Sequence, residues 1–591
     1  MTQERKAPQI TVLDAGGQYC HLIARKIREL GVSAEVRASD TSAGELRGRK
    51  GIVISGGPAS VYEAGSPRID PRILHLPGAA VLGICYGLQL MAHELGGEVI
   101  RGEQGEYGMA VLRTAGSHPL LAGLNGETRV WMSHRDRVEA PPPDFISIAA
   151  TTECPVAAMA HTTLPLFGLQ FHPEVVHTEH GKEIYANFLF RICGCERDWD
   201  PRGRVLEIEA DIRRFAGDRN VFFFVSGGVD STVAFTLCLR ALGPERVYGV
   251  YVDTGLMREG ETEFVENVFA KLGAAQFHVE DASARFLRAL EGVIEPEEKR
   301  KRIGEEFVAV QERILSGGDF LSGRWILGQG TIYPDTIESG GAAKADVIKT
   351  HHNRVAGIQM LIDEGRIVEP LSSFYKDEVR QAGGELGIPR EFLDRHPFPG
   401  PGLAIRCLCS ESEAPVERVG DGWILPVRSV GVQGDSRSYR QVLLVDGAPG
   451  DPGLHERATT LVNREVRVNR VIVRGGGAAP ETLRRTRGTV TKDRLDRLRA
   501  ADAVVRRLAA GQDFDGGIWQ FPVILIPIGA ADRPDSIVLR PVHSVDGMTA
   551  ESVSIPAPLM TAFCQSLLAL PGIAAVFHDL THKPPGTIEW E

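Results

Sequence analysis

The chain has 591 residues, of which 43% are hydrophobic and 24% charged, and its formal net charge is −11. A soluble protein of this length is expected to contain roughly three to five domains, and the acidic balance argues against bulk binding to nucleic acid. No apolar run approaches the ~20 residues that a membrane-spanning helix needs, so the composition argues against a membrane protein.

The nine cysteines are odd in number and scattered along the chain. A disulfide framework is therefore not expected, and a reducing cytoplasm fits better. Residues 1–9 are polar and lack the apolar core of a secretory signal. The pairs Cys193-Gly194-Cys195 and Cys407-Leu408-Cys409 do not have the spacing of a zinc site.

Short apolar runs in the first segment end in glycine-containing or polar turns. The three runs predicted to be strands are 10–13, 51–55 and 80–83. Helical stretches at 22–30 and 88–95 alternate with them. This alternation predicts a doubly wound parallel sheet, whose ligands bind at the carboxyl ends of the strands.

A cysteine stands at one of these strand ends, in Gly83-Ile84-Cys85-Tyr86-Gly87. Glycines two residues before and two after it permit the strained turn of a nucleophile elbow, and the following helix N-terminus would lower the thiol pKa. A lone cysteine is more often simply buried. However, an apolar strand later delivers His172 and Glu174, and the combination is the pattern of a Cys-His-Glu triad.

These elements resemble the class I glutamine amidotransferases over nearly all of residues 1–197. The resemblance implies hydrolysis of glutamine to glutamate and ammonia. Cys85 would attack the amide, His172 would move the proton, and Glu174 would orient the imidazole. The resemblance also places the oxyanion hole at the backbone N–H groups near Gly57 and Tyr86. Residues 101–113 and 133–136 match loops that in relatives hold glutamine or face the partner domain.

A charged linker is predicted at 198–204. After it comes the stretch whose pattern is most informative about function, a buried strand at 221–225 followed by a glycine turn. A strand, a glycine turn and a helix N-terminus together form a cradle for phosphate. The cradle resembles the pyrophosphate loop of the ATP pyrophosphatases, which split ATP into AMP and pyrophosphate. It lacks the Gly-Lys-Ser/Thr of a Walker A loop. Its residues are Ser226, Gly227, Gly228, Val229, Asp230, Ser231 and Thr232.

Further strands at 247–252, 325–327 and 347–349 end in polar turns. Asp253 follows the first of them, and the residues alone favour a helix cap for it. Residues 296–302 are a charge run that opens a helix through residue 314. Such a run is usually a solvated face.

Several motifs of this segment, in order, resemble the glutamine-hydrolysing GMP synthase family: 296–304, 328–335, 347–353, 375–380 and 396–406. The resemblance implies that ATP adenylates O2 of XMP, after which ammonia displaces AMP to give GMP. Mg²⁺ with ATP is the expected cofactor, without an organic prosthetic group. Besides the cradle, the implied ATP contacts are Asp253, Gly328 and Lys349. After residue 353 the chain departs from the shorter bacterial enzymes.

The third segment contains a repeat of two strands, a helix and a strand. The first copy comprises 424–430, 442–445, 454–466 and 470–473, and the second comprises 521–527, 537–539, 559–570 and 574–578. The predicted fold class is therefore α/β, with two doubly wound parallel-sheet domains at 1–197 and 203–404. A duplicated small α+β region follows, with lobes at 405–500 and 501–591.

In the family this region is a dimerisation domain, and the double lobe resembles the long form. We therefore expect the lobes to pair within one chain and the protein to be mainly monomeric, with a homodimer as the alternative. Residues 582–591 are polar and would by themselves be taken for a frayed end. The resemblance instead implies that they fold back onto XMP. The implied XMP contacts are Arg300, Asp435, Gln520, Lys583, Ile588 and Glu589.

Two alternatives stay open at this stage. One is an amidotransferase-coupled ATP pyrophosphatase with another acceptor, such as aspartate or a deamido-dinucleotide, against which the ordered motifs at 296–406 and 583–591 argue. The other is a non-catalytic scaffold or regulatory binding protein. The intact triad residues and phosphate cradle argue against it.

Overall fold

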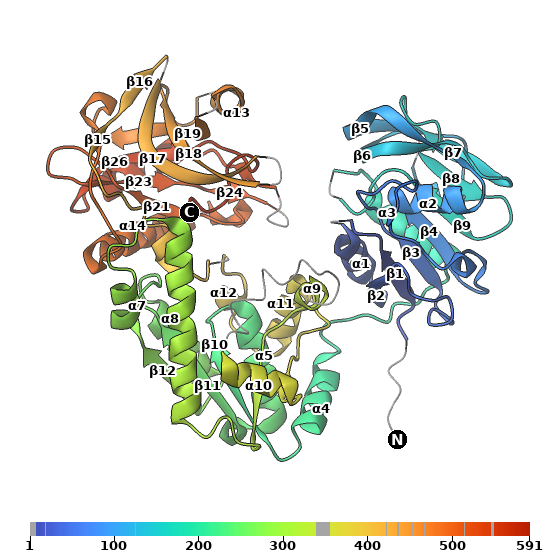
Figure 1. Ribbon diagram of the computed structural model, residues 1–591, viewed down its shortest axis with the longest axis horizontal. Coiled ribbons are helices and arrows are strands. Elements are labelled where there is room, and N and C mark those ends of the chain that lie inside the picture. Colours follow the sequence, from blue (N-terminus) through green and yellow to red (C-terminus); the bar gives the residue numbers. More distant parts are fainter. Residues whose placement is uncertain are drawn as a thin grey trace. The chain divides into compact units, whose positions relative to one another are not determined.

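The computed structural model describes residues 7–591, except 18, 125, 176, 339–354, 397, 421, 434–435, 452, 466, 513 and 545–548. It divides into two compact units, Met1–Gly203 and Arg204–Glu591 (Figure 1). The division falls within the predicted linker at 198–204. No helix of the described residues is long and apolar enough to cross a membrane.

The first unit is built on a sheet with nine described strands, in the order β2-β1-β3-β4-β9-β8-β7-β5-β6. The first five are parallel: β2 (Ala34–Ala38), β1 (Ile10–Asp14), β3 (Gly51–Ile54), β4 (Ala80–Ile84) and β9 (Leu166–Leu169). Three α-helices of this unit are α1 (Cys20–Glu29), α2 (Tyr86–Glu94) and α3 (Gly181–Ala186). The fully buried apolar residues of β1, β3, β4 and α2 form its core.

The sheet of the first unit contains the predicted parallel strands together with antiparallel strands that were not predicted. Four antiparallel strands extend it: β8 (Ala158–His161), β7 (Phe145–Ala150), β5 (Glu98–Thr114) and β6 (Glu127–Ala140). Residues 101–113 and 133–136, expected to be loops, lie in β5 and β6. Alternate residues of β6 from Thr128 to Val138 are buried, a period-two pattern that its charged outer face conceals.

The second unit begins with a five-stranded parallel sheet in the order β12-β11-β10-β13-β14, as predicted for its fold class. Its strands are β10 (Asn220–Val225), β11 (Val247–Asp253), β12 (Gln276–Asp281), β13 (Trp325–Gly328) and β14 (Ile367–Val368). The helices of this region are α4 (Val205–Ala216), α5 (Val229–Leu242), α6 (Glu261–Lys271), α7 (Ser283–Ala289), α8 (Pro296–Gly317), α9 (Tyr333–Glu338), α10 (Ala356–Asp363), α11 (Lys376–Glu385) and α12 (Arg390–Leu393). The predicted strand at 347–349 lies outside the described residues.

A seven-stranded sheet follows, in the order β16-β17-β18-β19-β26-β23-β21. Its elements are β16 (Glu417–Val419), β17 (Gly422–Gln433), β18 (Ser436–Val445), α13 (Leu454–Arg464), β19 (Val468–Gly477), β21 (Val523–Ile526), β23 (Asp535–Leu539), α15 (Ala557–Leu568) and β26 (Ile573–Asp579). In each half an antiparallel strand pair leads through a helix to a parallel third strand. The two third strands, β19 and β26, pair antiparallel in the middle of the sheet.

The second unit holds together because one hydrophobic core serves both of its large sheets. Buried residues of β11, α8, α14 (Lys492–Gly511), β23, α15 and β26 belong to a single apolar cluster. Helix α14 runs unbroken across 500/501, where a boundary between two lobes was expected. A division at that point would therefore cut a continuous helix.

The end of the chain is buried, contrary to what its polar composition alone suggested. The Trp590 side chain is fully buried among the apolar residues beneath the seven-stranded sheet, and its indole N–H donates to Asp579 Oδ2 at 2.9 Å. Arg470 and Asp579 are also fully buried and form an ion pair at 2.9 Å. Buried charged groups with partners, rather than an apolar pattern, hold this segment, and composition does not reveal such pairing.

Candidate active sites

Cys85 occupies a strained turn between β4 and α2. Its φ is +51°, a value that is uncommon for a residue with a side chain. The flanking glycines make this turn possible, because a Cβ on Gly83 would lie 2.4 Å from Gly87 O and a Cβ on Gly87 would lie 2.2 Å from Ile54 O. The nucleophile-elbow geometry predicted from the glycine spacing is therefore present.

The imidazole of His172 and the carboxylate of Glu174 are joined in the same site. His172 Nδ1 lies 2.7 Å from Glu174 Oε1, and both residues are buried. A Cβ built on Gly56 would lie 3.0 Å from His172 Cε1 and 3.5 Å from Cys85 Cβ, so the imidazole and the cysteine border the same glycine. The structure thus brings Cys85, His172 and Glu174 together.

The electrostatics of the site keep a proton on His172. Burial by itself lowers the pKa of an imidazole, but the negative charge of Glu174 and hydrogen bonds with Cys85 and Glu174 outweigh it and raise the pKa of His172 to about 10. At neutral pH the imidazole is therefore protonated. It can donate this proton to a leaving nitrogen.

Gly57 and Tyr86 lie at the ends of the neighbouring parallel strands β3 and β4. Tyr86 is the first residue of α2, where a backbone N–H has no acceptor within the helix. Gly57 packs so closely that its Cβ would lie 2.3 Å from Ala15 O. Both backbones are thus held near Cys85, and their oxyanion role stays a prediction.

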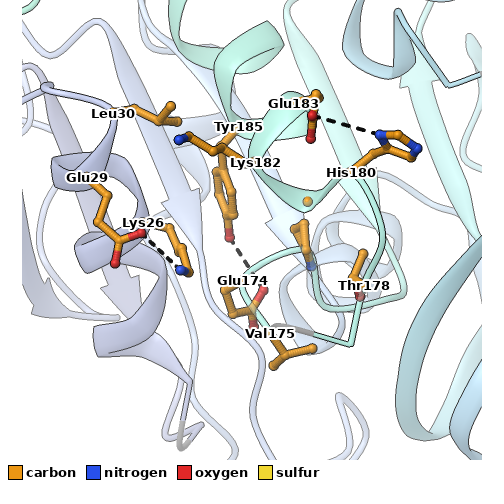
Figure 2. Close-up of a pocket in the computed structure, with 12 residues that line it drawn as sticks. Lys26, Glu29, Leu30, Glu174, Val175, Thr178, His180, Lys182, Glu183 and Tyr185 are labelled. Carbon is orange, nitrogen blue, oxygen red and sulfur yellow. Dashed lines mark hydrogen bonds and ion pairs between the residues drawn. The ribbon is translucent and has the colours of Figure 1, made fainter. Parts of the chain in front are cut away.

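A cavity of about 210 Å³ reaches the far side of Glu174, between α1 and residues 173–185. Figure 2 shows Tyr185 pointing from α3 toward Glu174, with its hydroxyl donating to Glu174 Oε2 at 3.4 Å. Tyr185 is fully buried, and burial followed by the Glu174 charge holds its pKa well above the usual value. Sequence reasoning missed this contact because no motif marks Tyr185.

In the second unit, the glycine turn after β10 has the geometry of a phosphate cradle. Gly227 has a φ of +73° and Gly228 is the N-cap of α5. The hydroxyls of Ser226 and Ser231 lie 3.0 Å apart, and Ser226 Oγ accepts the Gly228 N–H at 3.3 Å. Thr232 Oγ1 donates to Gly228 O at 3.0 Å. The loop is therefore held open at the start of a helix of 14 residues, whose N-terminal N–H groups favour an anion.

Two other predicted ATP contacts border the same sheet edge, because β11, β10 and β13 are adjacent and parallel. Gly328 ends β13, and a Cβ on it would lie 2.2 Å from the Phe223 ring. Asp253 ends β11, and its carboxylate accepts from Gly255 N at 2.8 Å and Thr262 Oγ1 at 2.7 Å. The Thr262 bond ties Asp253 to the first turn of α6, but the N-cap of α6 is Gly260 and no side chain caps this helix, so the cap interpretation was wrong. Lys349 lies outside the described residues.

A basic residue that sequence reasoning left without a role also reaches this loop. Lys376, the first residue of α11, places Nζ 2.9 Å from Asp230 Oδ2. The other carboxylate oxygen, Asp230 Oδ1, is buried without a hydrogen-bond partner among the described residues. An unpaired carboxylate oxygen beside a phosphate cradle fits the hard oxygen ligands that Mg²⁺ prefers.

A third cluster gathers around the end of the chain. Arg300 Nη2 donates to Glu591 O at 2.5 Å, and Gln520 Nε2 donates to Glu589 Oε1 at 3.0 Å. Lys299 is fully buried and pairs with Glu591 Oε2 at 2.5 Å, so the expectation of a solvated charge run was wrong for this residue. Three predicted XMP contacts, Arg300, Gln520 and Glu589, therefore lie in one cluster.

The remaining predicted XMP contacts are placed as follows. The Ile588 carbonyl accepts from Arg540 Nε at 3.0 Å. The Lys583 backbone pairs with Ala550 in both directions, at 3.1 and 2.7 Å. Asp435 lies outside the described residues. The segment that carries Lys583, Ile588 and Glu589 is thus docked in a defined position.

Family models match three stretches of the chain. They are "Glutamine amidotransferase class-I" at residues 11–192, "NAD synthase" at 205–313 and "GMP synthase C terminal domain" at 510–590. Together with the cysteine elbow and the phosphate cradle, these matches define an amidotransferase joined to an ATP pyrophosphatase.

Full-length relatives identify the family more closely. A probable glutamine-hydrolysing GMP synthase of Leptospira interrogans is 41% identical over 99% of both chains, and the GMP synthase of Symbiobacterium thermophilum is 40% identical over 100% of both. The crystal structure of a putative GMP synthase subunit from Thermoplasma acidophilum is 33% identical, covers 32% of this chain and 96% of its own, and has a TM-score of 0.30. The chain belongs to the glutamine-hydrolysing GMP synthase family.

Proposed function

We infer that the protein catalyses the ATP-dependent amination of XMP to GMP, with ammonia supplied by hydrolysis of glutamine. The observation that carries this inference is the presence, in one chain, of a Cys-His-Glu site, a phosphate cradle and a docked C-terminal segment. Relatives of the same length that are named GMP synthases support the choice of acceptor.

In the first unit, the Cys85 thiol gives its proton to His172, and the resulting thiolate Sγ attacks the side-chain amide carbon of glutamine. Protonated His172 gives its proton to the amide nitrogen, which leaves as ammonia, and a thioester forms on Cys85. Water then attacks the thioester, His172 takes a proton from this water, and glutamate leaves. Glu174 orients the imidazole, and the N–H groups of Gly57 and Tyr86 stabilise the oxyanion at each tetrahedral stage.

In the second unit, O2 of XMP bonds to the α-phosphorus of ATP and pyrophosphate leaves. Ammonia then adds at C2 of the adenylated base and AMP leaves, giving GMP. Residues 226–232 bind the departing phosphates through hydroxyls and helix N-terminal N–H groups, and the ammonium group of Lys376 adds positive charge beside Asp230. Asp253, Gly328 and Lys349 are the further proposed ATP contacts.

Asp230 is the described residue that would hold Mg²⁺, because its Oδ1 is buried and unpaired. When bound with ATP, the ion neutralises phosphate charge. We assign XMP to Arg300, Asp435, Gln520, Lys583, Ile588 and Glu589. Among these, the Lys583 ammonium is suited to the nucleotide phosphate as a point charge.

The proposed organisation is an amidotransferase domain at 1–197, an ATP pyrophosphatase domain at 203–404 and a duplicated C-terminal region at 405–591. The symmetric strand order of the seven-stranded sheet supports the duplication. Pairing of β19 with β26 inside one chain supports a monomer.

The first experiment measures pyrophosphate release from Mg·ATP with an ammonium salt as the nitrogen source. We expect strict dependence on XMP, with GMP as the product. Release that ignores XMP but responds to aspartate or a deamido-dinucleotide would overturn the acceptor. Absence of pyrophosphate release with every acceptor would instead support the alternative of a binding protein without catalytic activity.

Substitution of the nucleophile separates the two reactions. We expect Cys85→Ala to abolish glutamine-dependent GMP formation and to leave ammonia-dependent formation unchanged, because the acceptor chemistry does not use the thiol. Cys154→Ala is the matched control, since Cys154 is a fully buried cysteine of the same unit, and it should retain both activities. Loss of both activities in Cys85→Ala would mean that Cys85 is structural.

A further inference from the structure

The carboxylate of Glu589 is held by a buried arginine, Arg406, which ends the motif at 396–406 and to which no role has been assigned. Arg406 Nε donates to Glu589 Oε2 at 2.9 Å and Arg406 Nη2 donates to Glu589 Oε1 at 2.6 Å. Gln520 Nε2 also donates to Oε1. A two-pronged arginine–carboxylate pair fixes the plane of the carboxylate as well as its position.

Arg406 is not needed to dock the backbone of this segment, because other residues do so. Arg470 Nη2 donates to Thr587 O at 2.8 Å and Glu589 O at 2.7 Å. Arg540 binds the carbonyls of Thr587 and Ile588 at 2.8 and 3.0 Å. The contact of Arg406 with residues 587–591 is instead with a side chain, so its effect there is on the orientation of Glu589.

The surroundings of Arg406 restrict the orientation of its guanidinium. Its guanidinium is fully buried and stacks 5.3 Å from the centre of the Phe398 ring. Its Nη1 is buried without a hydrogen-bond partner among the described residues. Burial and the ring contact fix the guanidinium, and with it the direction of its two hydrogen bonds to Glu589.

We propose that Arg406 is a positioning residue for XMP, which holds the Glu589 carboxylate in the orientation that accepts hydrogen bonds from N–H groups of the purine base. The inference rests on the proposed role of Glu589 as an XMP contact. A fixed acceptor matches the donors of the xanthine ring without the entropic cost of ordering a free side chain at binding. Arg406 acts through Glu589 and does not itself bind the base.

The test uses Arg406→Lys in the full-length enzyme, with ammonium salt and pyrophosphate release as the readout. Lysine keeps the charge and loses the two-pronged geometry. We expect the KM for XMP to rise about tenfold, the equivalent of one charge-assisted hydrogen bond, while the KM for ATP stays unchanged. A parallel rise in both constants would overturn the proposal, because it would indicate general disruption.

A double-mutant cycle decides whether Arg406 acts through Glu589. In a Glu589→Gln background, Arg406→Lys should have almost no further effect on the KM for XMP. A full additional effect in that background would overturn the proposal. An unchanged KM for XMP in Glu589→Gln alone would show that Glu589 does not contact XMP, and the inference about Arg406 would fail with it. A wild-type enzyme that releases pyrophosphate without dependence on XMP would instead refute the proposed function.

The matched control is Arg494→Lys. Arg494 also binds a carboxylate through two donors, with Nε and Nη2 at 3.1 and 2.7 Å from Asp535 Oδ1, and it too is largely buried. The Arg494→Lys variant should keep the wild-type KM for XMP. A rise in this KM similar to that of Arg406→Lys would overturn the proposal. If Arg406→Lys does not fold, Glu589→Asp tests orientation with Arg406 intact, and a wild-type KM for XMP would again overturn it.

Discussion

His578 shows how strongly a single buried group responds to its position in the seven-stranded sheet. The side chain is fully buried in β26, and its Nε2 lies 3.0 Å from Val553 O. Burial first, and then the nearby positive charges of His455 and Arg540, lower its pKa to about 4, although Asp579 opposes the shift. The imidazole is therefore neutral in the folded protein at pH 7.

This shift predicts loss of stability in acid. Between pH 6.5 and about 4 the unfolded chain binds a proton at His578 and the folded chain does not, so the free energy of unfolding falls as the pH falls through this window. The lost contribution is at most about 3 kcal/mol. The urea midpoint measured from pH 7.5 to 4 should decline less steeply in His578→Gln than in the wild type. Equal slopes would contradict the assignment.

At the scale of elements, helix α5 has a glycine with positive φ just before it and another just after it. Gly227 (φ +73°) lies in the phosphate cradle, and a Cβ there would lie 3.1 Å from the Tyr251 ring and 3.2 Å from Val265 Cγ2. Gly243 (φ +88°) ends the helix, and a Cβ added to it would have no neighbouring atom of the described residues within 4 Å. The two glycines therefore share a positive φ and differ in their surroundings.

These two positions give a matched prediction. Alanine at either glycine places a side chain on a residue with positive φ, at a cost of about 1–3 kcal/mol. Only Gly227→Ala should also displace the cradle, so we expect it to raise the KM for ATP about tenfold or more. Gly243→Ala should lower thermal stability and keep the wild-type KM for ATP. Equal KM values in the two variants would argue against phosphate binding by this loop.

The sequence predicted helices and strands correctly where apolar runs and glycine turns mark their ends. The buried strands β1, β3, β4, β10 and β11 and the helix α8 fall within a few residues of their predicted bounds, because apolar runs and glycine turns mark them. Prediction failed at β5 and β6. In β6, charged residues on the outer face give the sequence the polarity of a loop. In β5, the exposed residues include the apolar side chains of Tyr107, Met109 and Val111, so burial does not follow hydrophobicity there.

At the scale of the whole molecule, the seven-stranded sheet determines what the C-terminal region can pair with. Strands β19 and β26 are paired with each other in its centre. In a protein with only one lobe, the corresponding central edge would be free to pair with another chain. Intrachain pairing instead satisfies both strands.

We therefore expect light scattering at micromolar concentration to give the mass of one chain, 64.3 kDa. The mass should not change on dilution, because no subunit interface would dissociate. A mass of twice this value would contradict the prediction. In that case, pairing of β19 with β26 within one chain would not prevent two chains from associating.

The candidate sites were predictable to different extents. The positions of Cys85, His172 and Glu174 followed from motifs, and the structure brings them together. The contacts of Tyr185 with Glu174 and of Lys376 with Asp230 were not predicted. Each joins elements that no local pattern connects.

The sequence by itself determined the family and the strand-end location of the nucleophile and phosphate cradle. Those features depend on residue types at short, fixed spacings, which local conformation dictates. Only the tertiary structure decided that Lys299 is buried against Glu591, that Arg406 holds the carboxylate of Glu589, and that Trp590 and Glu591 are buried. The reason is physical: burial of a charge is tolerable only when its partner arrives from elsewhere in the fold, and composition carries no record of that partner.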